Sequence, residues 1–156
     1  MKGDPQIIEA LNAVLTSELT AINQYFIHHK MAENWGYKKI SAHKRGESME
    51  EMRHADEVIE RILYFDGIPN MQRLNPVMVG ENVVEMHKVD LQLEYDAVKR
   101  LNDAIALCHE KKDGGTRDLL ERILVEEEEA IDYLEAQLGL IEELGKERYL
   151  AEQMHE

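Results

Sequence analysis

Four long stretches of the chain repeat their apolar residues at helical spacing, and only one connection between them is longer than a few residues. This spacing, together with only three prolines, favours helix over strand almost everywhere. The sequence shows no low-complexity linker and no shift in composition that would mark a domain boundary. We therefore expect one all-α domain that spans residues 1–156.

Capping residues, glycines and prolines set the expected helix boundaries. Asp4 is a good N-cap and Pro5 suits the first helical position, so the first helix begins there and ends at Trp35, before Gly36. The other expected helices span 39–66, 81–112 and 116–144, followed by a short segment at 147–154.

The connection between the second and third helices fixes the expected topology. It has about fourteen residues, with Pro69, Pro76 and Gly80, and loops of that length are uncommon in compact domains. A helix of roughly 28 residues is about 42 Å long, and fourteen extended residues span at most about 46 Å. The connection can therefore cross the full length of a bundle, which predicts a four-helix bundle with one long crossover.

Charge and cysteine content limit the expected partners. A formal net charge of −14 opposes binding to nucleic-acid phosphates and favours cations, although solubility alone would also explain it. We expect no membrane partner, because no apolar run is long enough to cross a bilayer and the N-terminus lacks a signal peptide. Cys108 has no second cysteine to pair with, which agrees with a cytoplasmic location.

Projection of each helix at about 100° per residue gives an inward apolar stripe. A single glutamate lies at the centre of the stripe in the first, third and fourth helices: Glu18, Glu94 and Glu127. The second helix is less cleanly patterned, and its inward face carries Glu51 and His54. The apolar residues of the four stripes are Ile7, Leu11, Val14, Ala21, Ile22 and Tyr25; Ile40, Val58, Ile62 and Phe65; Val83, Leu91, Val98, Leu101 and Ile105; and Leu120, Ile123, Leu124, Ile131, Leu134 and Leu138. We expect the acids beside Glu127, which are Glu126, Glu128 and Glu129, to be largely solvated.

The expected topology brings the four stripe glutamates to one level. Each lies roughly 11 to 13 residues from an end of the bundle, and at about 1.5 Å per residue these depths coincide. Buried carboxylates need a cation, and we expect no lysine or arginine on the stripes at that depth. Two divalent metals would balance the charge, and carboxylates with imidazole suit iron, manganese or zinc better than calcium. The alternative is that some of these glutamates point outward.

Several stretches of the chain carry a family resemblance. They include E-L-T-A-I-N-Q-Y-F at 18–26, E-S-M-E-E-M-R-H-A-D at 47–56, D-L-Q-L-E at 90–94 and I-D-Y-L-E at 131–135. Together they resemble the bacterioferritins along essentially the whole chain. The resemblance implies a ferritin-like fold and a hollow shell of twenty-four subunits built from dimers. It also implies a ferroxidase that oxidises Fe(II) at an intrasubunit di-iron site and stores the ferric mineral.

The resemblance also assigns the site residues. Glu18 and His54 would hold one iron with Glu51 as a bridge, and Glu94 would hold the other with Glu127 as a bridge. Molecular oxygen or peroxide would take two electrons from the Fe(II) pair. A Tyr25 side chain two turns beyond Glu18 is either a nearby one-electron donor or a core tyrosine.

Two positions depart from the family pattern. A histidine is expected three residues after Glu127, and the chain has Ala130, so the second iron lacks its imidazole. In this respect the site is more similar to the animal ferritin heavy chain. Relatives often have a histidine at position 46 on the inner surface of the shell, where the chain has Gly46, although Glu50 could still bind iron weakly there.

Met52 carries the other implied feature of the family. It is rotated about 100° from Glu51, toward an outer flank that also carries Phe26, Leu63, Leu19 and Ile59. From spacing alone Met52 would be a core gap-filler. The resemblance instead implies haem b at a two-fold interface, with its iron held by Met52 of each subunit and its propionates near Arg45 and Arg53. Such a haem would pass electrons from a donor protein to stored iron.

Two further classes of protein remain as alternatives. A DNA-protecting mini-ferritin would need metal ligands between subunits and usually a basic tail, and the chain has neither. A catalytically impaired, haem-carrying shell subunit is the stronger alternative, because Ala130 would make the chain depend on a second subunit type with an intact site. His87, which lies on the inward face of the third helix, is interpreted as a hydrogen-bonded core residue and not as a ligand.

Overall fold

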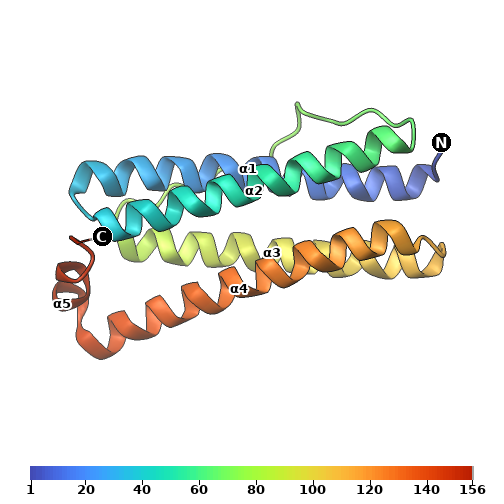
Figure 1. Cartoon of the computed structure of the whole chain (residues 1–156). Coiled ribbons are helices and arrows are strands. Elements are labelled where there is room, and N and C mark those ends of the chain that lie inside the picture. Colours follow the sequence, from blue (N-terminus) through green and yellow to red (C-terminus); the bar gives the residue numbers. More distant parts are fainter. Residues whose placement is uncertain (156) are drawn as a thin grey trace.

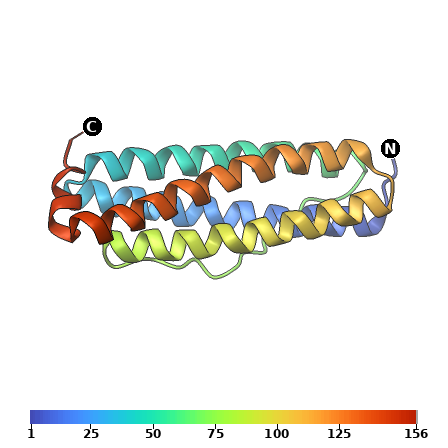
Figure 2. The same cartoon turned by 90° about the horizontal axis from the view of Figure 1, so that it is seen from below.

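The structure is a computed structural model, and it describes residues 1–155. This part of the chain contains five helices. They are α1 (Pro5–Trp35), α2 (Lys38–Tyr64), α3 (Val83–Glu110), α4 (Gly114–Leu144) and α5 (Lys146–Ala151). One antiparallel pair consists of α1 and α2, and a second consists of α3 and α4 (Figure 1). The short α5 lies at the end of the bundle opposite the N-terminus (Figures 1 and 2). The predicted four-helix bundle with one long crossover and a short fifth helix is confirmed.

The helix boundaries differ from the predicted ones by a few residues where side chains cap the backbone. The Asn82 side chain accepts a hydrogen bond from the Glu85 amide, so α3 begins at Val83 and not at residue 81. In the same way, Asp113 accepts from the Thr116 amide, and α4 therefore begins two residues earlier than predicted. At its C-terminal end α2 stops at Tyr64, because Asp66 adopts a left-handed conformation with φ of 59°. The crossover, residues 65–82, is consequently longer than predicted.

Five polar residues of α1 hold the crossover along the outside of the bundle, where Figure 2 shows it beside the helices. They are spaced four apart, so they form one stripe, and each hydrogen-bonds the crossover: Asn12, Thr16, Thr20, Gln24 and His28. The amides of Met78 and Gly80, for example, donate to Gln24 at 3.1 Å and to His28 at 2.9 Å. The crossover is thus bound along its length, although it has no helical period of its own.

Two apolar clusters lie toward the ends of the bundle with polar layers between them. The larger cluster includes Leu11, Val58, Leu101 and Leu120 and fills the half nearest the N-terminus. A smaller one, formed by Ala32, Ile40, Val83 and Tyr149, lies where α5 packs on the bundle. On α1 and α2, the buried polar residues between these two clusters include Glu18, Gln24, His28, Lys44, Glu51 and His54.

The inward face of α3 differs from its predicted stripe. Leu91, Val98 and Ile105 are only half-buried, so they flank the core and do not occupy its centre. Besides Val83, Met86 and Leu101, the fully inward line carries small or polar residues, which hydropathy alone does not reveal: His87, Asp90, Glu94, Ala97, Ala104 and Cys108. Within residues 1–155, no helix has the length and apolar content that a membrane span requires.

Candidate metal centre

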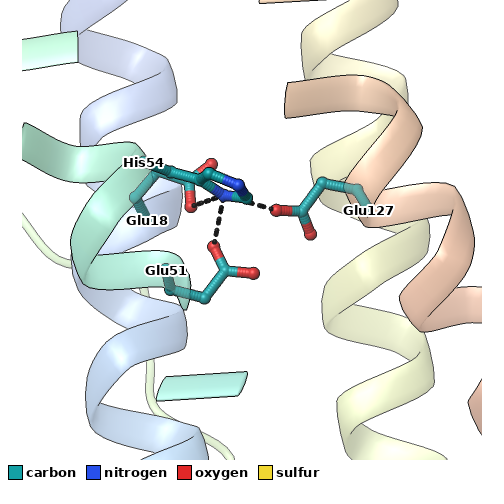
Figure 3. A group of neighbouring side chains, drawn as sticks. All are labelled: Glu18, Glu51, His54 and Glu127. Atoms are coloured by element: carbon teal, nitrogen blue, oxygen red, sulfur yellow. Dashed lines mark ion pairs between the residues drawn. The ribbon is translucent and has the colours of Figure 1, made fainter. Parts of the chain in front are cut away.

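Four of the five predicted ligands meet in one group at mid-bundle. Glu18 of α1, Glu51 and His54 of α2, and Glu127 of α4 each offer one ligand atom, and these atoms all lie within 4.8 Å of one another. Figure 3 shows the imidazole of His54 pointing between the carboxylates. Its Nδ1 lies 3.4 Å from Glu18 Oε2, 3.6 Å from Glu51 Oε2 and 3.2 Å from Glu127 Oε1. All four residues are at most 2% exposed.

The fifth predicted ligand, Glu94, lies beside this group and not inside it. It is buried, and its Oε1 accepts a hydrogen bond from the Tyr25 hydroxyl at 2.6 Å. Burial, and next the adjacent Glu127 carboxylate, hold the pKa of Glu94 well above its ordinary value. Tyr25 is itself fully buried, and burial followed by Glu94 raises the pKa of its phenol, which keeps it a hydrogen-bond donor. The geometry therefore gives Tyr25 a satisfied hydroxyl directly on a predicted ligand.

Four buried atoms of this cluster have no hydrogen-bond partner within the described residues: Glu18 Oε2, His54 Nδ1, Glu94 Oε2 and Glu127 Oε1. Buried polar atoms are normally paired, because leaving one unpaired costs on the order of 1–3 kcal/mol. Oxygen and imidazole nitrogen are also the donor types that divalent iron and manganese accept. The residues present therefore fit a bound metal cation.

The electrostatics of the cluster point the same way. Burial raises the pKa of Glu18 and Glu51, and the neighbouring carboxylate, Glu127 for the first and Glu18 for the second, raises it further. Burial also raises the pKa of Glu127 to about 7. For His54, burial alone would lower the pKa, but the surrounding glutamates outweigh it and raise the pKa far above its ordinary value. The cluster thus has a strong excess of negative charge at full ionisation, which a cation would relieve.

A lysine that the sequence analysis did not place in the core is buried in this region. It is Lys44 of α2, which lies two turns before Glu51 and therefore away from the level of the glutamates. Its ammonium does not serve the glutamates, because it donates to Asp90 Oδ2 at 2.7 Å. Lys44 therefore leaves the charge of the metal cluster unbalanced.

Lys44 belongs to a second buried polar layer, which the sequence analysis did not predict apart from His87. His28 and Gln24 also contact Asp90, at 3.1 and 2.8 Å, and Lys44 contacts His87 Nδ1 at 3.0 Å. The other ring nitrogen of His87 lies 2.9 Å from the hydroxyl of Tyr149, which in turn donates to Gln137 at 2.6 Å. The interpretation of His87 as a hydrogen-bonded core residue is confirmed. We name these residues the Asp90 network: Gln24, His28, Lys44, His87, Asp90, Gln137 and Tyr149.

The expectation that Glu126 is largely solvated is wrong. Its carboxylate is half-buried and contacts His54 Nε2, and it accepts from Arg53 Nη2 at 2.8 Å. Burial opposes ionisation of Glu126, but the contact with His54 lowers its pKa below the ordinary value. A carboxylate on the outer nitrogen of an imidazole fixes the ring and directs the other nitrogen toward a metal. The sequence alone does not reveal this role, because it depends on how α2 packs against α4.

The positions that depart from the family pattern are placed as follows. Ala130 is buried on α4 one turn after Glu127 and offers only a methyl group. Gly46 is exposed with open space around it. Glu50 is half-buried and forms a second, outer group of possible ligands with His54 and Glu126.

Met52 lies outside this cluster on the surface of α2. It is 52% exposed, and Phe26 and Leu63 of the same flank are 45% and 56% exposed. Arg45 is exposed as well, but Arg53 turns toward α4 and pairs with Glu126. Contact of Arg45 and Arg53 with haem propionates stays a prediction.

Comparison with known proteins agrees with this architecture. A family described as Ferritin-like domain matches residues 8–144. A bacterioferritin from Mycobacterium bovis is 51% identical over 152 residues, which is 97% of this chain and 96% of the relative. A bacterioferritin from Streptomyces coelicolor is 49% identical over 151 residues, which is 97% of this chain and 90% of the relative. One from Brucella melitensis is 43% identical over 149 residues, which is 96% of this chain and 92% of the relative. With identity this high over nearly the full length of both chains, the protein belongs to the bacterioferritins, within the ferritin-like family.

Proposed function

We propose that the protein stores iron in a hollow homo-oligomeric shell and oxidises Fe(II) at the mid-bundle cluster. The observation that carries this proposal is the convergence of four buried ligand atoms without hydrogen-bond partners, one from each of the four long helices, around the buried carboxylate of Glu51. Membership of the bacterioferritins supports iron as the metal that this cluster takes.

The donor atoms suggest two positions for the substrate Fe(II). His54 Nδ1 and Glu18 Oε2 face one position, and Glu94 Oε2 faces the other, with Glu51 and Glu127 between them as bridges. Two Fe(II) ions held together supply two electrons, which reduce molecular oxygen with two protons to hydrogen peroxide, or peroxide to water. The chain's own part is to hold both ions, orient His54 through Glu126 and keep the Tyr25 hydroxyl on Glu94.

A pair of neighbouring substitutions on α2 tests this function. Glu51→Ala removes a bridging carboxylate, and Glu50→Ala removes a half-buried acid one position earlier. We expect the initial rate of Fe(II) oxidation, followed by absorbance, to fall at least tenfold in the first variant and by less in the second. Light scattering would show that both still assemble. Equal rates would refute the assignment of Glu51 as a bridge.

The flank around Met52 supports a haem site between two copies of the chain. Met52 offers an exposed thioether that would bind haem iron, and the same residue of a two-fold partner would supply a second sulfur ligand. When bound, haem b supplies one-electron transfer, by which an electron-donor protein reduces stored iron. We expect Met52→Leu to change or abolish the haem absorption spectrum while the shell stays assembled. The matched variant Met78→Leu, in the exposed crossover, should leave the spectrum unchanged.

The assembly has a direct test. The family pattern is a shell of twenty-four subunits, and we expect light scattering near neutral pH to give a mass of that order. A mass of one or two subunits would contradict the proposed shell.

Ala130 favours a second candidate function, a haem-carrying shell subunit with an impaired site that depends on a second subunit type. The two candidates differ in the activity of the purified chain alone. Oxidation of Fe(II) by shells of this chain only would exclude the dependent subunit, and its absence together with an intact haem spectrum would support it.

A further inference from the structure

We infer that Glu47 is the additional ligand of the metal position served by Glu94, supplied from α2 in place of the imidazole that residue 130 of α4 does not provide. This inference rests on the proposed function, because it concerns the second of the two metal positions. It assigns a ligand role to a residue outside the predicted set.

The register of α2 against α4 places Glu47 at the level of Ala130. The two helices are antiparallel (Figure 1), and two contacts bracket this level. On one side Arg53 pairs with Glu126, and on the other the His43 ring stacks on Tyr133 with centroids 3.6 Å apart. Between these contacts, Ala130 falls opposite the turn of α2 that contains residues 47–50.

Within that turn the other three residues are placed elsewhere, which leaves Glu47 to serve the position beside Ala130. The hydroxyl of Ser48 donates to the Ile22 carbonyl of α1 at 2.9 Å, so it faces the other way. Met49 is 44% exposed, and Glu50 lies in the outer group with His54 and Glu126. The Glu47 side chain is only 15% exposed, and it lies one turn before Glu51, which directs it along the same face of α2.

The carboxylate of Glu47 also lies within electrostatic reach of the groups that it would join. After burial and the adjacent Glu127, it is among the groups that raise the pKa of Glu94, and it does the same for Tyr25. Glu94 Oε2 is buried and has no hydrogen-bond partner within residues 1–155, so it is a ligand atom that calls for a cation at this position.

The present partner of Glu47 is weak enough to be exchanged. Its Oε1 lies 3.3 Å from His43 Nε2, a long contact to a half-exposed ring on the same helix. Other acids near Ala130 are less available, because Glu126 is held by both His54 and Arg53, and Glu129 is exposed. With Glu47, the second position is an all-carboxylate site for a hard cation such as Fe(II), Fe(III) or Mn(II).

Co(II) binding to the assembled, iron-free protein tests this ligand without relying on oxidation. We expect the parent to bind two Co(II) per subunit in an anaerobic titration followed by the visible Co(II) bands. Glu47→Gln should keep the tighter site and weaken the other at least tenfold, and Glu47→Asp, which keeps the charge but shortens the reach, should act similarly. Glu60→Gln, an exposed acid of α2, is the matched control and should titrate like the parent.

A second substitution separates a ligand role from a structural one. Ala130→His added to Glu47→Gln should restore the second Co(II), because it returns a ligand to the same position from the opposite helix. Parent-like titration of Glu47→Gln, equal weakening of both sites or failure of this rescue would each overturn the inference and leave the proposed function standing. If the parent bound no Co(II) and Glu51→Ala oxidised Fe(II) like the parent, the proposed function itself would fall.

Discussion

Two buried polar layers lie next to each other in this bundle, and they differ in how their charges are met. In the Asp90 network, one carboxylate faces one ammonium, that of Lys44, and the remaining members are histidine, glutamine and tyrosine side chains that hydrogen-bond within the layer. In the metal cluster, four glutamates contact one imidazole, that of His54, and Glu94 lies beside them. Four buried atoms there have no hydrogen-bond partner within the described residues. None of those unpartnered atoms belongs to the Asp90 network.

The contrast separates a structural polar layer from a binding layer. Although burial alone raises the pKa of Asp90, Lys44 and His28 together lower it below its ordinary value. In the metal cluster, burial and neighbouring carboxylates both raise the pKa of the glutamates. A layer whose partners all come from the chain stabilises the fold, whereas a layer that lacks a cation is completed by binding one.

The largest expected effect on stability comes from disrupting the Asp90 network. Lys44→Met keeps most of the length of the side chain but leaves Asp90 as a buried charge without its ammonium partner. Removing one partner of a buried ion pair costs about 3–5 kcal/mol, so we expect the denaturation midpoint of the metal-free protein to fall sharply. Lys39→Met, at an exposed position of the same helix, is the control and should change little. Similar midpoints for both variants would show that the Asp90 network is not structural.

The next effect is a pH dependence that arises in the same layer. Burial, and next the Lys44 ammonium, lower the pKa of His87 from 6.5 to about 2. Between these two pH values the unfolded chain binds a proton that the folded chain does not, so the free energy of unfolding falls as pH falls below 6.5. At pH 5 this loss is of the order of 2 kcal/mol.

His87→Gln should flatten this slope, because glutamine does not titrate, even if it lowers stability at all pH values. The groups that face His87 are Lys44, Asp90, His28, His43 and Tyr149. Unfolding measured at several pH values between 5 and 7.5 gives the slope directly, and His109→Gln, on the exposed part of α3, is the control. An unchanged slope in His87→Gln would assign the acid sensitivity to another group.

A smaller effect is expected where the metal cluster meets the surface. Glu126→Gln removes the charge that holds His54 Nε2, so the ring should lose part of its fixed orientation. Losing such an outer carboxylate typically weakens metal binding tenfold or more, which corresponds to about 1.4 kcal/mol. Co(II) titration should show this loss at the position served by His54, while the exposed acid variant Glu129→Gln should behave like the parent. If both titrate alike, Glu126 does not position His54.

The fold and the principal acids could be predicted because they follow from periodicity within single helices. The bundle and its crossover could be predicted from helical spacing, Pro5, Gly36 and the long interval between the second and third helices. Buried carboxylates at one level could likewise be predicted from the stripe positions of Glu18, Glu51, Glu94 and Glu127.

The residues that were missed depend on partners distant in the sequence. Lys44 stands in a polar stretch of α2 that reads as a solvated face, and only Asp90, 46 positions away, makes its burial tolerable. Glu126 is similar, because its partner His54 is 72 positions away on another helix. The polar stripe of α1 that binds the crossover has a regular spacing of four, but what it binds has no period to detect.

The smallest expected effect is also the one whose sign distinguishes the two layers most directly. Burial, and next the Glu127 carboxylate, raise the pKa of Glu18, so its ionised form is disfavoured in the metal-free protein. Glu18→Gln should therefore stabilise the metal-free protein by about 1 kcal/mol. The same variant should lose most of the extra stability that Co(II) gives the parent, because a ligand is gone.

Asp90→Asn should act in the opposite direction, since it leaves the Lys44 ammonium buried without its carboxylate. Denaturation in chelator and in Co(II), with Glu9→Gln as the exposed control on α1, measures all of these differences. If Glu18→Gln destabilised the metal-free protein as Asp90→Asn does, the metal cluster would be a second structural layer, and its unpartnered atoms would need another explanation.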